Sequence, residues 1–438
     1  MQSRLIYLVT ITALCLLCST AYSQTDSTHY DLGRLRINKN LTQDITIKAA
    51  DLEKFPFANL TDAINVWFNG TYTNSNSILY IIDGNAINNV DAYNIHDIDE
   101  ITLVQNAAAQ TNGALPQQQL VLIKTKRSHL NSSGIDAAGQ TSLVTIRNNQ
   151  GYENVNSTTN LFHQYYFSGY KNSENISAGI SATYLRDVYP TLKTSTLQVN
   201  EPTANNIFKF NGYADVKLNR RNTLSASVNY MPQVNQFQST NNLISNINQS
   251  SSQTQTIVNQ HTNQNLFNTT LQLNSQIVTG LTNKISGSYN HFSFAENNLT
   301  TSTTTGYSAN SSKSVDSIKH RTSSFLLTDN LIYQKTLGDF SLEPSFNFSY
   351  RYVSDSSNVS NSFVNYLLND SPLLTSASSY SSHVYTTRKD YLLTSSLGLS
   401  YKSIVNLQGG FLTVLNSKKN FNTDIKRSFP FASININV

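Results

Sequence analysis

Nothing in this sequence constrains the fold more than a two-residue alternation of apolar and small polar side chains, which recurs from about residue 130 onward. The clearest examples are residues 222–231, 340–352, 391–401 and 432–438. Successive side chains of a strand point to opposite faces, so the alternation predicts strands with one apolar and one polar face. We place about twelve such strands, a pattern typical of either a soluble β-sandwich array or an antiparallel transmembrane β-barrel.

Composition favours the barrel and argues against several other classes. The chain has 24 Tyr and 20 Phe but only 13% charged residues, whereas disordered chains are highly charged and poor in aromatics. The net charge of +4 is spread without basic blocks, so no nucleic-acid partner is expected. The eight His residues lack the spacing of a zinc site. No nucleophile triad, paired-carboxylate motif or Gly-rich phosphate loop occurs, so we expect neither an enzyme nor a cofactor.

Polar stretches rich in Asn, Ser and Thr separate several of the expected strands. The three longest are residues 235–264, 297–319 and 353–380. Because outer-membrane barrels carry their longer connections on the extracellular side, we expect these stretches to be extracellular loops.

The N-terminus has the pattern of a cleaved export signal. Arg4 precedes an apolar run from Leu5 to Cys18, and Ala21 and Ser23 stand at the −3 and −1 positions of a cut before Gln24. About 14 apolar residues are too few for a transmembrane helix, which needs about 20. Both cysteines of the sequence lie in this segment, so no disulfide is expected in the mature chain. We therefore predict a signal peptide over 1–23 and an exported protein.

Residues 24–127 have the texture of a small α+β domain. Two short helices are expected over 49–56 and 59–67, the second because apolar residues at 60, 63, 64 and 67 share one helical face, with Asn59 as its N-cap. Strands are expected over 78–82, 100–104 and 120–126, and Asp83-Gly84 is expected to form a tight turn.

The order of motifs in this domain resembles the plug domain of TonB-dependent outer-membrane receptors, specifically the SusC-like group. The resemblance rests on residues 51–56, 59–64, 78–84, 95–104 and 122–127, and residues 390–397 and 429–433 resemble two landmarks of that family's barrel. It implies a plug at 24–127, a β-barrel over 128–438 in the outer-membrane lipids, and nutrient uptake driven through TonB. It also implies a surface lipoprotein partner of the SusD-like kind.

Two features depart from the family pattern. Gln105-Asn106 stand where family plugs usually have Lys-Asp. A segment contacting TonB is expected only around residues 31–37, where Asp31, Leu32, Leu35 and Ile37 are the candidates. The alternatives for this segment are an ordinary first strand or a flexible tail.

The expected barrel is incomplete relative to the family, in which the Phe-Pro landmark falls mid-barrel. Plugged lumens belong to barrels of about 22 strands, so about twelve cannot enclose a domain of about 100 residues. Three arrangements follow: half of a split receptor completed by a second chain, a truncated copy, or a narrower closed barrel with the small domain outside the lumen.

At the level of single residues the sequence offers no catalytic, metal or ligand site. Asp97, Asp99 and Glu100 form the one tight acidic group of the small domain, and we interpret it as a solvated strand start and not as a calcium site. The favoured function is plug-gated uptake by a TonB-dependent receptor. The alternative is a β-barrel that does not pump and has a surface-binding or structural role.

Overall fold

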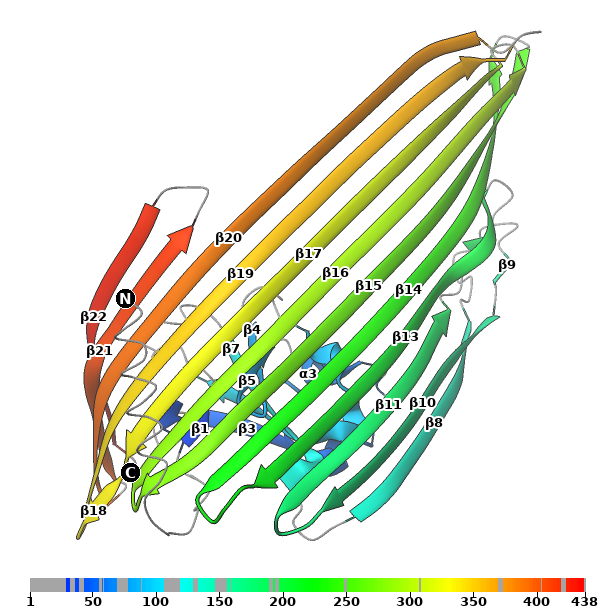
Figure 1. The fold of residues 1–438 in the computed structure, drawn as a ribbon. Coiled ribbons are helices and arrows are strands. Elements are labelled where there is room, and N and C mark those ends of the chain that lie inside the picture. The colour runs from blue at the N-terminus through cyan, green and yellow to red at the C-terminus, as the bar shows by residue number, and fades with distance from the viewer. Residues whose placement is uncertain are drawn as a thin grey trace.

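The computed structural model shows a small α+β domain lying against one face of a large antiparallel sheet (Figure 1). It describes residues 29–31, 36–38, 43–54, 57, 59–68, 78–87, 89–105, 119–128, 133–145, 156–157, 159–188, 192–193, 197–247, 250–306, 309–368, 373–402, 404–418 and 423–436. The predicted signal peptide lies outside these residues. Among the described helices, none has the length and apolar content needed to cross a bilayer.

The small domain, which we call the plug, is built on a five-stranded sheet of order β3-β6-β7-β4-β5. Its elements are β3 (Gln43–Lys48), α2 (Ala49–Leu52), α3 (Leu60–Trp67), β4 (Ile78–Ile82), β5 (Asn85–Ile87), η3 (Val90–Ala92), η4 (Ile95–Asp97), β6 (Ile98–Gln105), β7 (Gln119–Thr125) and η5 (Lys126–Ser128). Only the β4–β7 pair is parallel. A hairpin of β1 (His29–Asp31) and β2 (Arg36–Asn38) pairs separately from this sheet.

An apolar core holds the plug together. The α3 helix buries Leu60, Ala63 and Ile64 on the face predicted by their spacing, and the strands add Ile101 and Ile123. The α2 helix is shorter than predicted and ends at Leu52. Asn59 occupies the N-cap position of α3, but its side chain makes no capping hydrogen bond, which corrects that part of the prediction.

The large sheet, which we call the wall, contains twelve strands in one continuous path, as the sequence predicted. From one edge to the other they are β8 (Ser133–Thr145), β10 (Thr159–Asn172), β11 (Ile176–Val188), β13 (Leu197–Lys217), β14 (Asn222–Ile247), β15 (Ser250–Val278), β16 (Leu281–Gly306), β17 (Asn310–Tyr333), β19 (Phe340–Leu367), β20 (Leu373–Tyr401), β21 (Val405–Lys418) and β22 (Thr423–Ile436). Short strands β9 (Asn156–Ser157) and β12 (Leu192–Lys193) pair with each other, and β18 (Lys335–Leu337) pairs with β19.

The three polar stretches predicted as extracellular loops are strands instead. Residues 235–247 and 250–264 form the paired upper halves of β14 and β15, and most of 297–319 and 353–380 falls within β16, β17, β19 and β20. Hydroxyl groups bond across these strands, for example Thr254 Oγ1 to Thr304 Oγ1 at 3.0 Å and Thr256 Oγ1 to Ser302 Oγ at 3.1 Å. Cross-strand hydrogen bonding thus supports pairing where no apolar face marks a strand in the sequence.

The outer face of the wall carries a belt of exposed apolar and aromatic side chains. Tyr289 of β16 lies opposite Phe325 of β17, and eight residues further down β16, Leu281 lies opposite Tyr333. At about 3.3 Å per residue this distance is about 26 Å, which matches the apolar band of about 25 Å in outer-membrane barrels. The belt therefore marks the height at which the wall would meet lipid.

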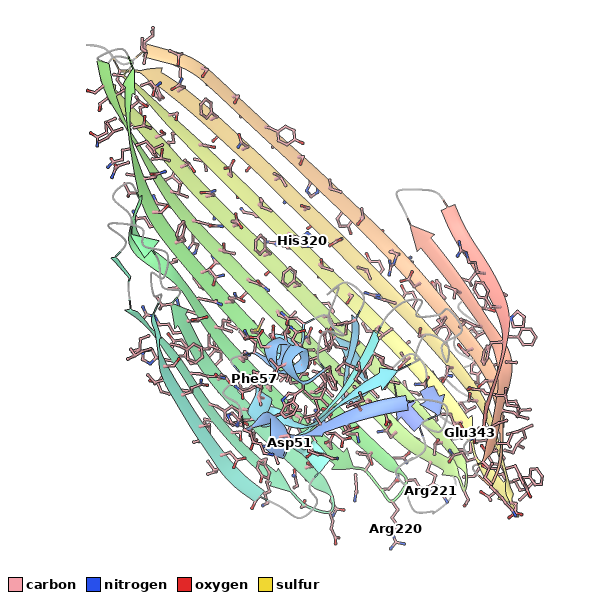
Figure 2. The ribbon with its side chains drawn as sticks, turned by 180° about the vertical axis from the view of Figure 1, so that it is seen from behind. Asp51, Phe57, Arg220, Arg221, His320 and Glu343 are labelled. Atoms are coloured by element: carbon pink, nitrogen blue, oxygen red, sulfur yellow. The ribbon has the colours of Figure 1, made fainter. Side chains whose placement is uncertain are left out.

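The wall is open among the described residues, because β8 and β22 form its two edges and do not pair with each other. The plug contacts the inner face, defined by Tyr166, Ser181, Asn211 and Asn229 (Figure 2). This overturns one of the three expected arrangements, a narrower closed barrel with the small domain outside. The reason is that the plug makes hydrogen bonds to the inner face of four wall strands.

Candidate functional site

The contact between plug and wall centres on Asp97, the last residue of η4. Its carboxylate accepts hydrogen bonds from Tyr166 Oη of β10 at 2.8 Å, Ser181 Oγ of β11 at 3.0 Å and Asn211 Nδ2 of β13 at 2.9 Å. A capping box fixes the turn that carries it, because the Asn94 backbone N–H donates to Asp97 and the Asn94 side chain accepts from the η4 backbone. One plug residue thereby binds three consecutive wall strands.

A row of asparagines leads across the wall to this carboxylate. Asn211, Asn229, Asn268 and Asn290 lie opposite one another in register on β13, β14, β15 and β16. Asn268 Nδ2 donates to Asn229 Oδ1 at 3.4 Å, and Asn229 Nδ2 donates to Asn211 Oδ1. Asn211 then donates to Asp97. The amide dipoles point the same way, so each donor is polarised toward the negative charge.

A second group of contacts forms just above the asparagine row. Asn94 Nδ2 donates to Thr183 Oγ1 at 3.1 Å, and the Lys209 ammonium donates to the Tyr93 carbonyl at 3.4 Å. Ala92 packs on an apolar strip of the wall; this strip consists of Phe162, Leu185, Ile207, Met231 and Leu266. The Val90–Asp97 segment of the plug therefore rests on both apolar and polar parts of the inner face.

The Asp83-Gly84 turn anchors the other end of the contact. Both residues have positive φ, 46° and 80°, as the two central positions of a tight hairpin turn require. The Asp83 carboxylate accepts from Thr125 Oγ1 at 2.7 Å and lies 3.6 Å from Arg127 Nε. Arg127 in turn stacks over the Tyr213 ring of β13, with 4.8 Å from its guanidinium carbon to the ring centroid. The turn thus reaches the wall through one arginine.

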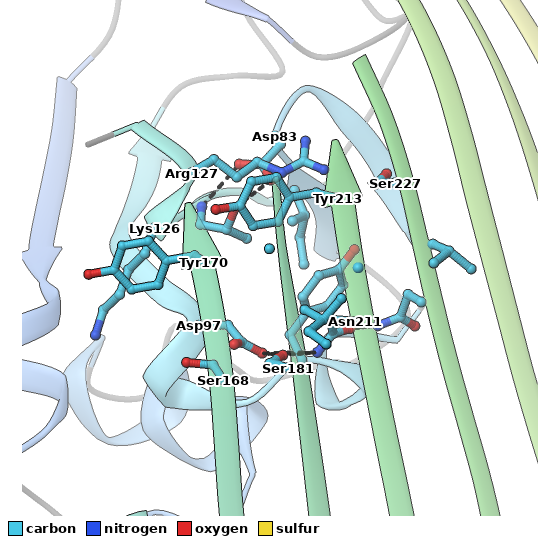
Figure 3. A pocket seen from close by; sticks show the side chains of 18 of the residues that line it. Asp83, Asp97, Lys126, Arg127, Ser168, Tyr170, Ser181, Asn211, Tyr213 and Ser227 are labelled. Atoms are coloured by element: carbon cyan, nitrogen blue, oxygen red, sulfur yellow. Dashed lines mark hydrogen bonds and ion pairs between the residues drawn. The ribbon is translucent and has the colours of Figure 1, made fainter. Parts of the chain in front are cut away.

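A cavity of about 80 Å³ lies between these contacts (Figure 3). Asp83, Asp97 and Arg127 line it from the plug, and Ser181 and Tyr213 line it from the wall. The lining mixes charged groups, hydroxyls and amides with ring faces and aliphatic side chains such as Ile82, Ile87 and Val228. No group of three or more His, Cys, Asp or Glu side chains that could hold a metal occurs among the residues that the structure describes.

The pKa values of two plug carboxylates, one buried against the wall and one partly exposed, are shifted in opposite directions. Burial raises the pKa of Asp97 above its usual value, although hydrogen bonds from Tyr166, Ser181, Asn94 and Asn211 act to lower it. Burial also acts to raise the pKa of Glu53, but Lys126 and His96 outweigh it and the pKa is lowered.

The structure corrects the interpretation of the acidic group 97–100. Asp97 is not a solvated strand start: it lies in η4, before β6 begins at Ile98, and its carboxylate is enclosed by the wall. Glu100 lies in β6 and forms ion pairs with Lys48 and Lys124. Sequence reasoning missed Asp97 because its partners come from three strands far along the chain. The only local signal was the Asn94-x-x-Asp97 capping box.

The candidates for TonB contact lie at the N-terminal hairpin. Asp31 belongs to β1 and lies opposite Arg36, and Ile37 belongs to β2 and lies opposite Tyr30. Leu32 and Leu35 lie outside the described residues. The hairpin therefore holds two of the four candidates in extended backbone, apart from the plug sheet.

With this architecture in view, the chain was compared with known proteins. No family model and no curated protein matches it. Among solved structures, the RagAB peptide importer in its open-open state aligns with a TM-score of 0.58 at 13% identity, over 95% of this chain and 58% of that one. The closed-closed state of the same importer gives 0.55 at 12% identity, over 90% and 57%.

The chain has the fold of a TonB-dependent outer-membrane receptor, in which a plug lies against the inner face of an antiparallel β-barrel wall. It spans less than three fifths of the length of the RagAB chains that it matches.

Proposed function

We propose that this chain acts in TonB-dependent nutrient uptake across the outer membrane, with the plug as the gate. The observation that carries the proposal is the chemistry of the plug–wall contact, where Asp97 and Arg127 of the plug bond to the inner face and Lys209 of the wall donates to the Tyr93 carbonyl of the plug. Polar contacts can be exchanged for water when the plug moves, because a hydrogen bond contributes a net of only about 0.5–1.5 kcal/mol, or about 1.5–3 kcal/mol where one partner is charged. Such a contact suits a body that has to move.

The proposed mechanism begins at the N-terminal hairpin, where TonB holds the segment around residues 31–37. Traction on this segment would shift the plug and separate Asp97 from Tyr166, Ser181 and Asn211. The asparagine row of the wall would then be hydrated, and a polar path would open along the inner face. Return of the plug would restore the hydrogen bonds and close the path.

Two further components belong to the proposal. Unpaired strand edges in lipid cost several kcal/mol for each orphaned backbone group, so we propose that further strands complete the barrel between the edges at β8 and β22. We also assign a SusD-like surface lipoprotein as the partner on the extracellular side, and export through cleavage of a signal peptide over residues 1–23.

Removal of the plug tests the gating role. A deletion of residues 24–127 that keeps the signal peptide should abolish the dependence of uptake on TonB and raise passive entry of small solutes. Uptake of labelled nutrients in cells with and without TonB is the measurement, with outer-membrane amounts matched by immunoblot. Unchanged uptake with unchanged TonB dependence would contradict the proposal.

One observation favours a second candidate, a surface-binding barrel that does not pump. Strands β14 to β17, β19 and β20 are far longer than the membrane height (Figure 1), and β15 alone has 29 residues where about 9–11 suffice to span a membrane. The projecting part is rich in Ser, Thr and Asn. If this candidate holds, cells lacking TonB should keep every phenotype that depends on the protein.

A further inference from the structure

A guanidinium with incomplete charge compensation lies on the inner face of β19. Arg351 is two residues from Val353, which continues the asparagine row through Ser324, so Arg351 shares the face that the plug contacts. It stands opposite Asp390 of β20, whose carboxylate already accepts from Arg388 Nε at 2.9 Å and lies 2.8 Å from Arg388 Nη2. Arg351 is half-buried, and the Asp390 carboxylate that attracts it is already engaged by Arg388. Two cations therefore share one anion.

A carboxylate with free capacity lies on the same face, four residues along the same strand. Asp355 Oδ1 accepts from Thr322 Oγ1 at 2.6 Å and lies 3.5 Å from His320 Nε2, while no hydrogen bond to its Oδ2 occurs within the described part of the chain. Its side chain is 43% exposed. Figure 2 shows His320 on the plug-bearing face, further along the strands than the plug.

The spacing of these two groups defines a ligand. Four residues of strand span about 13 Å, and an extended peptide of four residues spans about 13–14 Å. Resting on the proposed uptake function, we propose that Arg351 and Asp355 bind the two ends of a short linear peptide, with the carboxylate at Arg351 and the ammonium at Asp355. Val353, between them on this face, contacts the peptide's middle. Phe292, whose ring centroid lies 6.2 Å from that of His320, adds an apolar surface for side chains.

The charges fit a zwitterion better than a neutral sugar. An uncharged oligosaccharide would leave Arg351 and Arg388 to share the single Asp390 carboxylate, and incomplete charge compensation is costly in a half-buried position. A carboxylate matches the planar fork of a guanidinium and forms the stronger, charge-assisted class of hydrogen bond. The opposite charges at the two ends also fix the direction of the peptide, with its C-terminus toward the level of the plug.

Peptides with blocked ends test the site on the full-length protein purified in detergent. Calorimetry with tetra-alanine, its C-terminal amide and its N-acetyl form should give the tightest binding for the free peptide and at least tenfold weaker binding for each blocked form. The comparison needs no variant, so misfolding cannot obscure it. Equal affinity for all three peptides, or no binding of any, would overturn the proposal.

Single substitutions then assign each end. Arg351→Gln should weaken the binding of tetra-alanine about tenfold and leave the binding of its C-terminal amide unchanged. Asp355→Asn should weaken the binding of tetra-alanine about tenfold and leave the binding of the N-acetyl form unchanged. Arg321→Gln is the matched control, because Arg321 is exposed and points to the opposite face of β17. A loss that is equal for free and blocked peptides would count against an end-binding role.

Failure of this site is distinguishable from failure of the proposed function. Uptake that depends on TonB and on the plug, without any preference among the three peptides, would refute the peptide site alone. End-specific peptide binding by a protein whose plug deletion leaves uptake unchanged would refute the gating function and leave the site in place.

Discussion

The plug and the wall are stabilised by different chemistry within one chain. The plug buries Leu60, Ile64, Ile101 and Ile123 in one apolar cluster, as an ordinary globular domain does. The buried side chains on the inner face of the wall are largely polar; they include Lys209, Thr328, Asn330 and Ser349. The junction between the two regions has the chemistry of the wall and not of the plug, apart from the small apolar strip under Ala92. A body with its own core, held by polar contacts, can move without unfolding.

The largest effect should come from a cavity in the plug core. Ile101→Ala removes a fully buried side chain from the centre of β6 and should destabilise the plug by about 2–5 kcal/mol. Limited proteolysis of the protein in outer membranes would detect a plug that is cut while the wall stays intact. Degradation of the wall together with the plug would contradict separate stabilisation of the two regions, because they would then unfold as one unit.

Loss of the central junction residue should have the next largest effect. Asp97→Ala leaves Tyr166, Ser181 and Asn211 without their shared acceptor and should weaken docking of the plug by about 1–3 kcal/mol. Hydrogen exchange should speed up in η3 and η4 but not in the core strand β7. Asp62→Ala, in the first turn of α3, is a matched control. Equal exchange in the two variants would mean that Asp97 does not hold the plug.

The pattern of these residues explains how far the sequence could lead. Alternation predicted the membrane-height part of the strands, and helical spacing predicted α3, because one apolar face is buried in each. The upper parts of β14 to β20 were missed because hydroxyl pairs such as Thr254 and Thr304 stabilise a strand without an apolar face.

The junction was missed for a different reason. Tyr166, Ser181 and Asn211 lie 69, 84 and 114 residues from Asp97, and only the register of the wall brings them together. Asp97 also stands just before the acidic pair Asp99-Glu100, where a solvated role fits the local sequence equally well. Short-range patterns therefore identify both bodies but not the contact between them.

Docking of the plug should depend on pH through Asp97. Because burial raises the pKa of Asp97 in the docked state, the protonated form favours docking, and this contribution is lost as pH rises from 3.8 through the raised pKa. Glu53 acts in the opposite direction within the plug: its pKa is lowered, so its contribution is present above 4.5 and is lost as pH falls. Hydrogen exchange of η4 should thus speed up with rising pH more than intrinsic exchange requires. Asp97→Asn should remove this excess, whereas Glu53→Gln should not.

The smallest effect should come from a hydroxyl pair in the projecting part of the wall. Thr304→Ala removes the 3.0 Å hydrogen bond to Thr254 and should cost about 0.2–1 kcal/mol, because cross-strand pairs contribute on that scale. Neighbouring pairs such as Thr256 and Ser302 remain, so exchange should quicken only at nearby amides of β15 and β16, with no change in the plug. Thr301→Ala, on the same strand but facing the other way, is the control. If Thr304→Ala instead speeds up hydrogen exchange in the plug, the plug and the projecting part of the wall are energetically coupled. The plug would then not move as a body independent of the wall.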